Sequence, residues 1–203
     1  MNRKFVIGID EAGRGPLAGP VTVAAIAIKD PISGIKYRVF FKNIRDSKKL
    51  TPSGREEWFK KLISNPRILI AHSSVGHKTI DKIGIAKAVS RAVKNCLCIL
   101  NTKYLILHTR HKILLDGSLY APSTYKEQQT IIKGDEKIPI IAAASIVAKV
   151  VRDRKMVNFS KNYPVYDFHI HKGYGTLRHR LAIKKYGLCD IHRRSFCRNI
   201  HFF

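Results

Sequence analysis

Residues 5 to 11 read Phe5-Val6-Ile7-Gly8-Ile9-Asp10-Glu11, an apolar run that ends abruptly in two acids. A short run of β-prone residues of this kind is typical of a buried strand. A second run repeats the design further along the chain, where Ile113-Leu114-Leu115 leads directly into Asp116-Gly117. The sequence therefore predicts two buried strands, each with acidic side chains at its carboxyl end.

The segments that follow the first run predict more strands and then a helix. Residues 20–28 and 34–41 favour strands with short links, which indicate an antiparallel meander. Thr51-Pro52 is a favourable helix start, because proline is well tolerated at the first helical position. Residues 68–75 favour another strand.

The second half of the chain predicts alternating helices and strands. A helix capped by Thr79 is expected to run towards Leu100, and another is expected to end near residue 159 after a strand or turn at residue 138. Residues 177–186 favour a further helix, whereas residues 101–111 fit no pattern and are expected to be an insertion. This order of elements indicates an α/β or mixed-sheet domain.

Composition limits the classes of protein to which the chain can belong. Its 203 residues are 45% hydrophobic, enough to build a core, so wholesale disorder is excluded despite a formal net charge of +24. Each half of the chain carries 19 basic and 7 acidic side chains, so the charge is not confined to a tail. Nucleic acid is the commonest polyanionic partner of such a protein, although a generally basic proteome would produce the same composition.

Two absences bear on location. No apolar stretch reaches the roughly 20 residues that a membrane helix needs, so no membrane partner is expected. The four cysteines form no C-x-x-C pair and are expected to be reduced thiols, which predicts a cytoplasmic protein.

The few acids of the chain stand at informative places. Asp10 and Glu11 end one predicted strand, Asp116 ends another, and Asp135 follows Lys133-Gly134 at a turn ahead of a helix. If the two strands are neighbours, these carboxylates converge at one sheet edge, where open α/β sheets bind their ligands. Converging carboxylates repel unless cations neutralise them, and Mg²⁺ prefers such oxygen ligands. A basic protein with one acidic site suggests a metal-dependent nuclease, although any single acid could simply fix a turn.

The chain resembles the type 2 ribonuclease H family, ribonuclease HII, in motifs that follow one another from residue 8 to residue 196. The motifs that carry the resemblance are Gly8-Ile9-Asp10-Glu11-Ala12-Gly13-Arg14-Gly15-Pro16, Asp46-Ser47-Lys48-Lys49-Leu50, Leu115-Asp116-Gly117, Lys133-Gly134-Asp135, Ala142-Ala143-Ala144-Ser145, His171-Lys172-Gly173-Tyr174-Gly175 and His192-Arg193-Arg194-Ser195-Phe196.

The resemblance implies an α/β fold with a ribonuclease H-like mixed five-stranded sheet flanked by helices. Residues 1–160 would form the catalytic domain, and residues 161–203 a basic C-terminal helical extension packed on it. The family hydrolyses the RNA strand of RNA–DNA hybrids and incises 5′ of ribonucleotides embedded in duplex DNA, leaving 5′-phosphate and 3′-hydroxyl ends. We accordingly expect a monomeric endonuclease that serves ribonucleotide removal and the degradation of primer RNA.

The resemblance also implies a role for each site residue. The carboxylates of Asp10, Glu11, Asp116 and Asp135 would bind Mg²⁺ or Mn²⁺ and carry a two-metal-ion hydrolysis. Gly13, Arg14 and Gly15 would grip the ribose 2′-hydroxyl and the adjacent phosphate, and Tyr174 would stack on the following deoxyribose. Further substrate contacts are expected from basic side chains, namely Lys48, Lys49, Lys149, Arg152, Arg193 and Arg194.

Two other functions remain open on the sequence. A non-catalytic nucleic-acid-binding protein would use the acids structurally, and Asp10→Asn would then change nothing. A resolvase or integrase would use a similar acid cluster on a different substrate, although Gly13-Arg14-Gly15 and Tyr174 argue against it.

Overall fold

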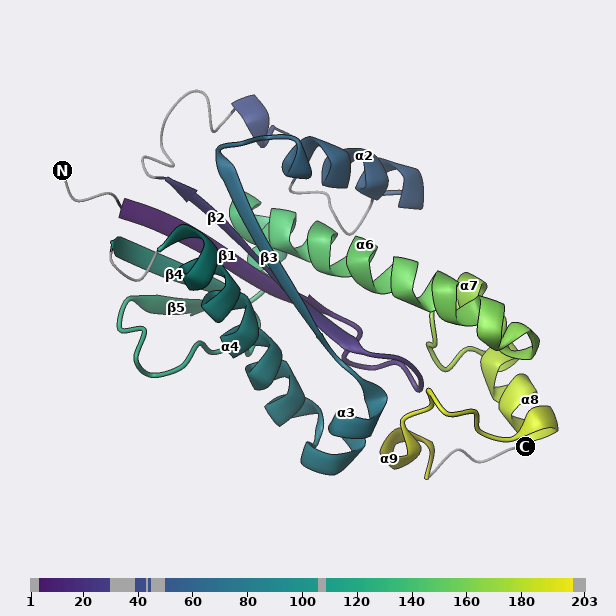
Figure 1. Ribbon diagram of the computed structural model, residues 1–203. Helices are drawn as coiled ribbons and strands as arrows, with labels where there is room; N and C mark the ends of the chain where they lie inside the picture. Colours follow the sequence, from purple (N-terminus) through teal and green to yellow (C-terminus); the bar gives the residue numbers. More distant parts are fainter. Residues whose placement is uncertain (1–3, 30–38, 43, 45–49, 106–108, 199–203) are drawn as a thin grey trace.

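A computed structural model describes residues 4–29, 39–42, 44, 50–105 and 109–198 of the chain (Figure 1). Its centre is one sheet of five strands in the order β3-β2-β1-β4-β5. The strands are β1 (Lys4–Ala12), β2 (Val21–Lys29), β3 (Ile68–Val75), β4 (Arg110–Asp116) and β5 (Gln128–Ile131). β2 runs antiparallel to both β1 and β3, whereas β4 runs parallel to β1 and β5. The expected mixed five-stranded sheet is therefore confirmed.

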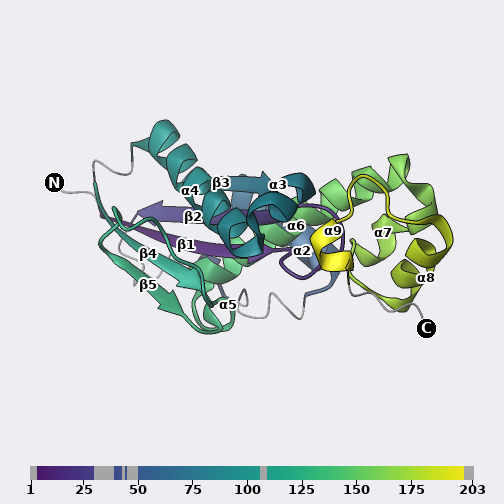
Figure 2. The same cartoon turned by 90° about the horizontal axis from the view of Figure 1, so that it is seen from below.

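Helices cover both faces of this sheet (Figures 1 and 2). On one face, Ile7 and Ile9 of β1 share a core with α4 (Ile85–Tyr104). On the other face, Val6 shares a core with α6 (Pro139–Asn162) and α2 (Pro52–Ile63). Since successive strand residues point to opposite faces, β1 is apolar on both sides, as its continuous apolar run predicts.

Gly8 lets α6 approach β1 closely. A Cβ atom at this position would lie 2.5 Å from the backbone oxygen of Ile140, in the first turn of α6. Only a glycine therefore fits between strand and helix. This contact seats the first turns of α6 beside the carboxyl end of β1.

One prediction about the first half lies mostly outside the described residues, and another is wrong. Of the segment 34–41, residues 34–38 are not described, whereas Val39 and Phe40 are helical. The predicted helix from Thr79 is two helices, α3 (His77–Ile83) and α4, because Gly84 between them has a φ of 81° that no regular helix contains.

The segment 101–111, which fitted no pattern in the sequence, is partly regular structure. Its first four residues complete α4, which ends at Tyr104, and its last two belong to β4. Residues 106–108, between them, lie outside the described residues. By contrast, the start predicted at Thr51-Pro52 is confirmed, since the Thr51 hydroxyl caps α2 by accepting the Gly54 amide at 3.1 Å.

The C-terminal elements gather beyond one end of the sheet, at the right of both views (Figures 1 and 2). They are η3 (Pro164–Tyr166), α7 (Phe168–His171), α8 (Leu177–Tyr186) and α9 (Arg194–Cys197). η3, α7 and α8 share a small core with Ala18 and Met156, whereas Phe196 of α9 packs against the core on the α4 side of the sheet. Ala18 also bridges to His192. No helix in the described ranges is long and apolar enough to cross a membrane.

Two buried histidines that are hydrogen-bonded to each other join these elements. His179 donates from Nδ1 to the Tyr174 carbonyl at 2.9 Å, so its Nε2 is left as an acceptor. His192 Nε2 donates to that nitrogen at 3.0 Å, and His192 Nδ1 accepts the Cys189 amide at 2.9 Å. Both rings are therefore neutral, and each tautomer is fixed by its neighbours. The hydrogen bond between the two histidines holds the segment that carries Tyr174 against the segment that ends at His192.

Gly8→Ala should destabilise the fold, because the new methyl group meets backbone that cannot swing aside. We expect the free energy of unfolding to fall by about 1–3 kcal/mol. Gly54→Ala is the matched control, since its Cβ would make only ordinary contacts in the first turn of α2 and should raise stability by about 0.5 kcal/mol. Urea unfolding of both variants checks this pair, and equal effects in the two would contradict the account of the β1–α6 contact.

The buried histidines should weaken the fold as the pH falls. Burial lowers the pKa of His179 and of His192 to about 4, from an ordinary value near 6.5. Between these values the unfolded chain binds more protons than the folded one, so the histidines' contribution to stability is lost as the pH falls through this window. Asp10 and Glu11, whose pKa values are raised, act in the opposite direction.

The histidine effect is isolated by comparing wild type with His192→Gln. The difference between their free energies of unfolding should shrink by about 2 kcal/mol between pH 7 and pH 5. Urea titrations at the two pH values measure it, and a difference that does not change with pH would contradict the assignment of a buried neutral ring.

Candidate active site at the carboxyl ends of β1 and β4

The two acid-terminated strands lie side by side. β1 and β4 are parallel neighbours in which Ile9 pairs with Leu115, so the next residues, Asp10 and Asp116, stand at the same end of the sheet. By strand alternation both carboxylates belong to the face covered by α6, where Val6 and Leu114 also pack. The convergence predicted for these two acids is confirmed.

Asp10 is the most enclosed acid of β1, with 4% of its surface exposed. Its carboxylate accepts the Glu11 amide at 2.7 Å and is hydrogen-bonded by the Ser145 hydroxyl on α6. Burial raises the pKa of Asp10 well above its ordinary value, and the negative charges of Glu11 and Asp116 raise it further. The ionised form of Asp10 is therefore destabilised in this site. A cation bound nearby would stabilise it.

Glu11 lies at the mouth of the same site and is less enclosed. Burial raises its pKa, while Arg14, whose Nη1 lies 3.1 Å from the Glu11 carboxylate, opposes the shift. The same guanidinium nitrogen lies 3.3 Å from the Ser118 hydroxyl, just beyond the end of β4. Arg14 therefore spans the ends of the two acidic strands.

Asp135 approaches the site from α5 (Gly134–Lys137). Asp116 accepts the amides of Gly134 and Asp135 at 2.6 and 3.3 Å, so the backbone of this short helix begins against the β4 acid. The Asp135 side chain is fully buried. The structure therefore places a fourth acid directly behind Asp116, at a position that only the turn before it indicates in the sequence.

The chemistry of this donor set fits a hard divalent cation. All four candidate ligands offer the carboxylate oxygens that hard divalent cations prefer, and the negative charges of Glu11 and Asp116 add to burial in raising the pKa of Asp10. Among the described residues, no three His, Cys, Asp or Glu side chains stand in an arrangement that already encloses a metal ion. Metal binding would therefore require the carboxylates to turn towards one another.

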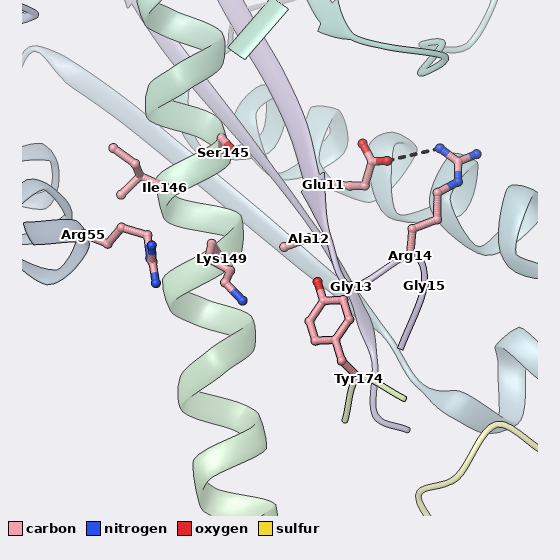
Figure 3. Close-up of a pocket in the computed structure, with 10 residues that line it drawn as sticks. All are labelled: Glu11, Ala12, Gly13, Arg14, Gly15, Arg55, Ser145, Ile146, Lys149 and Tyr174. Atoms are coloured by element: carbon pink, nitrogen blue, oxygen red, sulfur yellow. Dashed lines mark hydrogen bonds and ion pairs between the residues drawn. The ribbon is translucent and has the colours of Figure 1, made fainter. Parts of the chain in front are cut away.

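An open pocket of about 350 Å³ adjoins the acids (Figure 3). Glu11 and Ser145, which both contact Asp10, line it together with three cationic side chains, those of Arg14, Arg55 and Lys149. Its charge is therefore opposite to that of the acid cluster beside it. A phosphate group fits such a pocket in charge.

The ring of Tyr174 lies in this pocket between Lys149 on α6 and the turn at Gly13–Gly15 (Figure 3). The Lys149 ammonium is 5.5 Å from the ring centre, and the Arg152 guanidinium is 5.6 Å from it. The side chain remains 41% exposed, which leaves ring surface for a ligand. The backbone of Tyr174 is fixed by His179, so the ring is presented from a rigid support.

The two glycines of the turn differ in what requires them. Gly13 has a φ of 91°, and a Cβ there would lie 1.9 Å from Arg152 Nε, so both backbone and packing demand a glycine. Gly15 is exposed, and a Cβ there would meet nothing within 4 Å. Nothing within the described protein explains why residue 15 lacks a side chain, whereas close approach by a ligand does.

The structure corrects the prediction that Arg152 and Arg193 contact substrate. Both side chains are fully buried, and their guanidinium groups donate to backbone carbonyls. Arg194 is exposed, although its backbone amide is held by Asp81 at 2.9 Å. Lys48 and Lys49 lie outside the described residues.

Lys149 lines the pocket, and it also forms an ion pair with Asp153 at 3.0 Å. Two polar residues of the pocket were not predicted as site residues. Arg55 sits within α2, where a basic residue is unremarkable in so basic a chain. Ser145 follows three alanines in the sequence, and its hydroxyl is hydrogen-bonded to Asp10. In the sequence, only its place within the Ala142-Ala143-Ala144-Ser145 motif could have indicated it.

Known proteins of similar sequence and structure identify the family of this chain. The family model described as Ribonuclease HII matches residues 7–199. A ribonuclease HII of Caldicellulosiruptor saccharolyticus is 44% identical over 197 residues, covering 97% of this chain and 89% of that protein. One of Acetivibrio thermocellus is 46% identical, covering 97% of this chain and 71% of its own length.

Among solved structures, ribonuclease H2 of Pyrococcus horikoshii superposes with a TM-score of 0.71 at 30% identity, covering 94% of this chain and 93% of that one. The similarity thus extends through the sheet, its covering helices and the C-terminal elements. A family model and relatives of this similarity, each spanning nearly the full chain, show that the protein belongs to the ribonuclease HII family.

Proposed function

We propose that this protein is an endoribonuclease that hydrolyses the RNA strand of RNA–DNA hybrids and incises duplex DNA 5′ of embedded ribonucleotides. The observation that carries the proposal is the contact between two oppositely charged regions. Acids stand at the carboxyl ends of β1 and β4, with Asp10 buried and Asp116 half-buried, and a cationic pocket opens directly beside them. The basic side chains of the pocket would bind the phosphodiester group of a nucleic acid. The acids beside the pocket would hold metal ions next to the bond that is hydrolysed.

Asp10, Glu11, Asp116 and Asp135 are the residues that would hold Mg²⁺ or Mn²⁺. When bound, two such ions supply an activated water and stabilise the departing 3′-oxygen. Ser145 fixes the orientation of the Asp10 carboxylate, and the α5 amides fix that of Asp116.

The remaining residues of the pocket bind and orient the nucleic acid. Arg14, Arg55 and Lys149 neutralise phosphate charge, and the exposed face of Tyr174 stacks on a sugar. Gly15 lets the backbone come close to the ribose, whose 2′-hydroxyl distinguishes RNA from DNA. These roles place the ribonucleotide between the Gly13–Gly15 turn and the acids.

Asp10→Asn should abolish cleavage without weakening the fold or duplex binding. A duplex with a single ribonucleotide, incubated with Mg²⁺ or Mn²⁺, should be nicked 5′ of that nucleotide by wild type and at least about a thousandfold more slowly by the variant. Because Asn removes a buried charge, the free energy of unfolding should not fall.

Asp190→Asn is the matched control, since this carboxylate is 60% exposed and pairs with Lys78 at the surface. Its nicking rate should equal that of wild type. Metal-independent nicking, or full activity of Asp10→Asn, would refute the proposed function.

Gly15→Ala should weaken substrate binding while leaving the fold intact. The added methyl group points into open space in the free protein but would occupy the position of the ligand. We expect the Kd for a ribonucleotide-containing duplex to rise at least about tenfold, which is about 1.4 kcal/mol, with an unchanged melting temperature.

Gly76→Ala serves as the control here, because a Cβ at Gly76 also meets nothing within 4 Å and the position is remote from the pocket. Fluorescence anisotropy in EDTA measures both affinities. Unaltered affinity in Gly15→Ala would show that no ligand approaches this backbone.

A further inference from the structure

We propose that Arg193 is a positioning residue that, from inside the protein, turns the backbone amides of Arg14 and Gly15 towards the pocket as donors to substrate oxygens. The inference rests on the proposed function, because it assumes that the Gly13–Gly15 turn meets the ribose and its phosphate. It assigns to Arg193 a role quite different from direct contact with nucleic acid.

All three nitrogens of the Arg193 guanidinium donate hydrogen bonds to backbone carbonyls of one loop. Nε donates to the Gly19 carbonyl at 2.9 Å, Nη1 to the Arg14 carbonyl at 2.9 Å, and Nη2 to the Gly13 carbonyl at 2.6 Å. The Arg193 backbone amide adds a bond to the Leu17 carbonyl at 2.7 Å. One side chain thus fixes the orientation of two successive peptide groups in the turn.

Because the peptide group is planar, fixing the carbonyl groups also fixes the direction of the amide N–H groups. In a planar trans peptide the carbonyl oxygen and the amide hydrogen point in opposite directions. When the Gly13 and Arg14 carbonyls point inward to Arg193, the amide N–H groups of Arg14 and Gly15 point away from it. Two successive amides that face the same way make a concavity that binds anions and hydroxyl oxygens.

The outward side of these peptides is the pocket. Gly13, Arg14 and Gly15 all line it, and Gly15 is exposed. Within the described parts of the chain, neither the Arg14 nor the Gly15 amide donates to a protein acceptor. Their hydrogen-bonding capacity therefore remains for a ligand.

Burial of the Arg193 guanidinium costs free energy, and this cost supports a specific role for an arginine at this position. Arg193 is fully buried, and no carboxylate in the described ranges pairs with it at ion-pair distance. A buried cation satisfied by carbonyl dipoles is costly, and lysine could reach only part of this set from a single nitrogen. Arg152 adds further hydrogen bonds to the same loop. It donates to the carbonyls of Pro20 and Lys172 and so joins the loop to the segment that carries Tyr174.

The test compares Arg193→Lys and Arg193→Gln with wild type in EDTA, so that binding is measured without cleavage. Two duplexes that differ only in one 2′-hydroxyl are used, and the measured quantity is the ratio of their Kd values. Wild type should bind the ribonucleotide duplex at least tenfold more tightly than the all-DNA duplex, and both variants should reduce this ratio at least fivefold. Leu100→Ala, which truncates a buried core side chain of α4, controls for lost stability alone and should keep the wild-type ratio.

The possible results separate the inference from the proposed function. If wild type shows no preference for the ribonucleotide, the proposed function fails and the inference fails with it. If wild type discriminates and Arg193→Lys discriminates equally, only the inference is overturned. A reduced ratio in Leu100→Ala would overturn it too, because stability would then explain the effect.

Amide hydrogen exchange of wild type tests the inference even if neither Arg193 variant folds. The Arg14 and Gly15 amides should exchange rapidly in the free protein and become protected by the ribonucleotide duplex more than by the all-DNA duplex. Protection already present in the free protein, or none in either complex, would overturn the proposed orientation.

Discussion

The site depends on the parallel pairing of β1 with β4. Its register sets Ile9 opposite Leu115 and therefore brings Asp10 and Asp116 together at one edge of the sheet. Burial raises the pKa of Asp10, and the negative charges of Glu11 and Asp116 beside it raise it further, so the ionised form of Asp10 is held at a cost in free energy. Gly8 admits α6 and so places Ser145 over Asp10, while α5 presents its amides to Asp116. The elements around the sheet edge thus orient the two acids without neutralising them.

The net charge of +24 gains a clearer meaning from this geometry. Basic residues are spread over the whole chain, but among the described residues the cations that line the pocket are Arg14, Arg55 and Lys149. Arg152 and Arg193 add positive charge beneath the surface, where it fixes the backbone. The described basic residues around the pocket therefore differ in place: some line it, and others are buried and hold the turn beside it.

Sequence patterns predicted the acids better than the arginines. A buried strand that ends in Asp10-Glu11 follows from local composition, and so do the start of α2 at Thr51 and the helix over 177–186. The strand predicted over 34–41 lies mostly outside the described residues, and Val39 and Phe40 within it are helical. Burial of Arg152 and Arg193 could not be foreseen, since only the fold brings backbone carbonyls from residues 13–20 around their side chains. Arg55 and Ser145 were missed for a related reason, because their helices reach the site only through tertiary packing.

In the proposed mechanism the Asp10 and Asp116 carboxylates together bind a divalent cation. Carboxyl ¹³C NMR during a Mg²⁺ titration of the 203-residue protein measures this directly. We expect saturable shifts of both carboxyl resonances and a fall in the apparent pKa of Asp10, with the Asp116 shift much weakened in Asp10→Asn. Resonances that do not respond to millimolar Mg²⁺, or an Asp116 response that persists unchanged in Asp10→Asn, would contradict it.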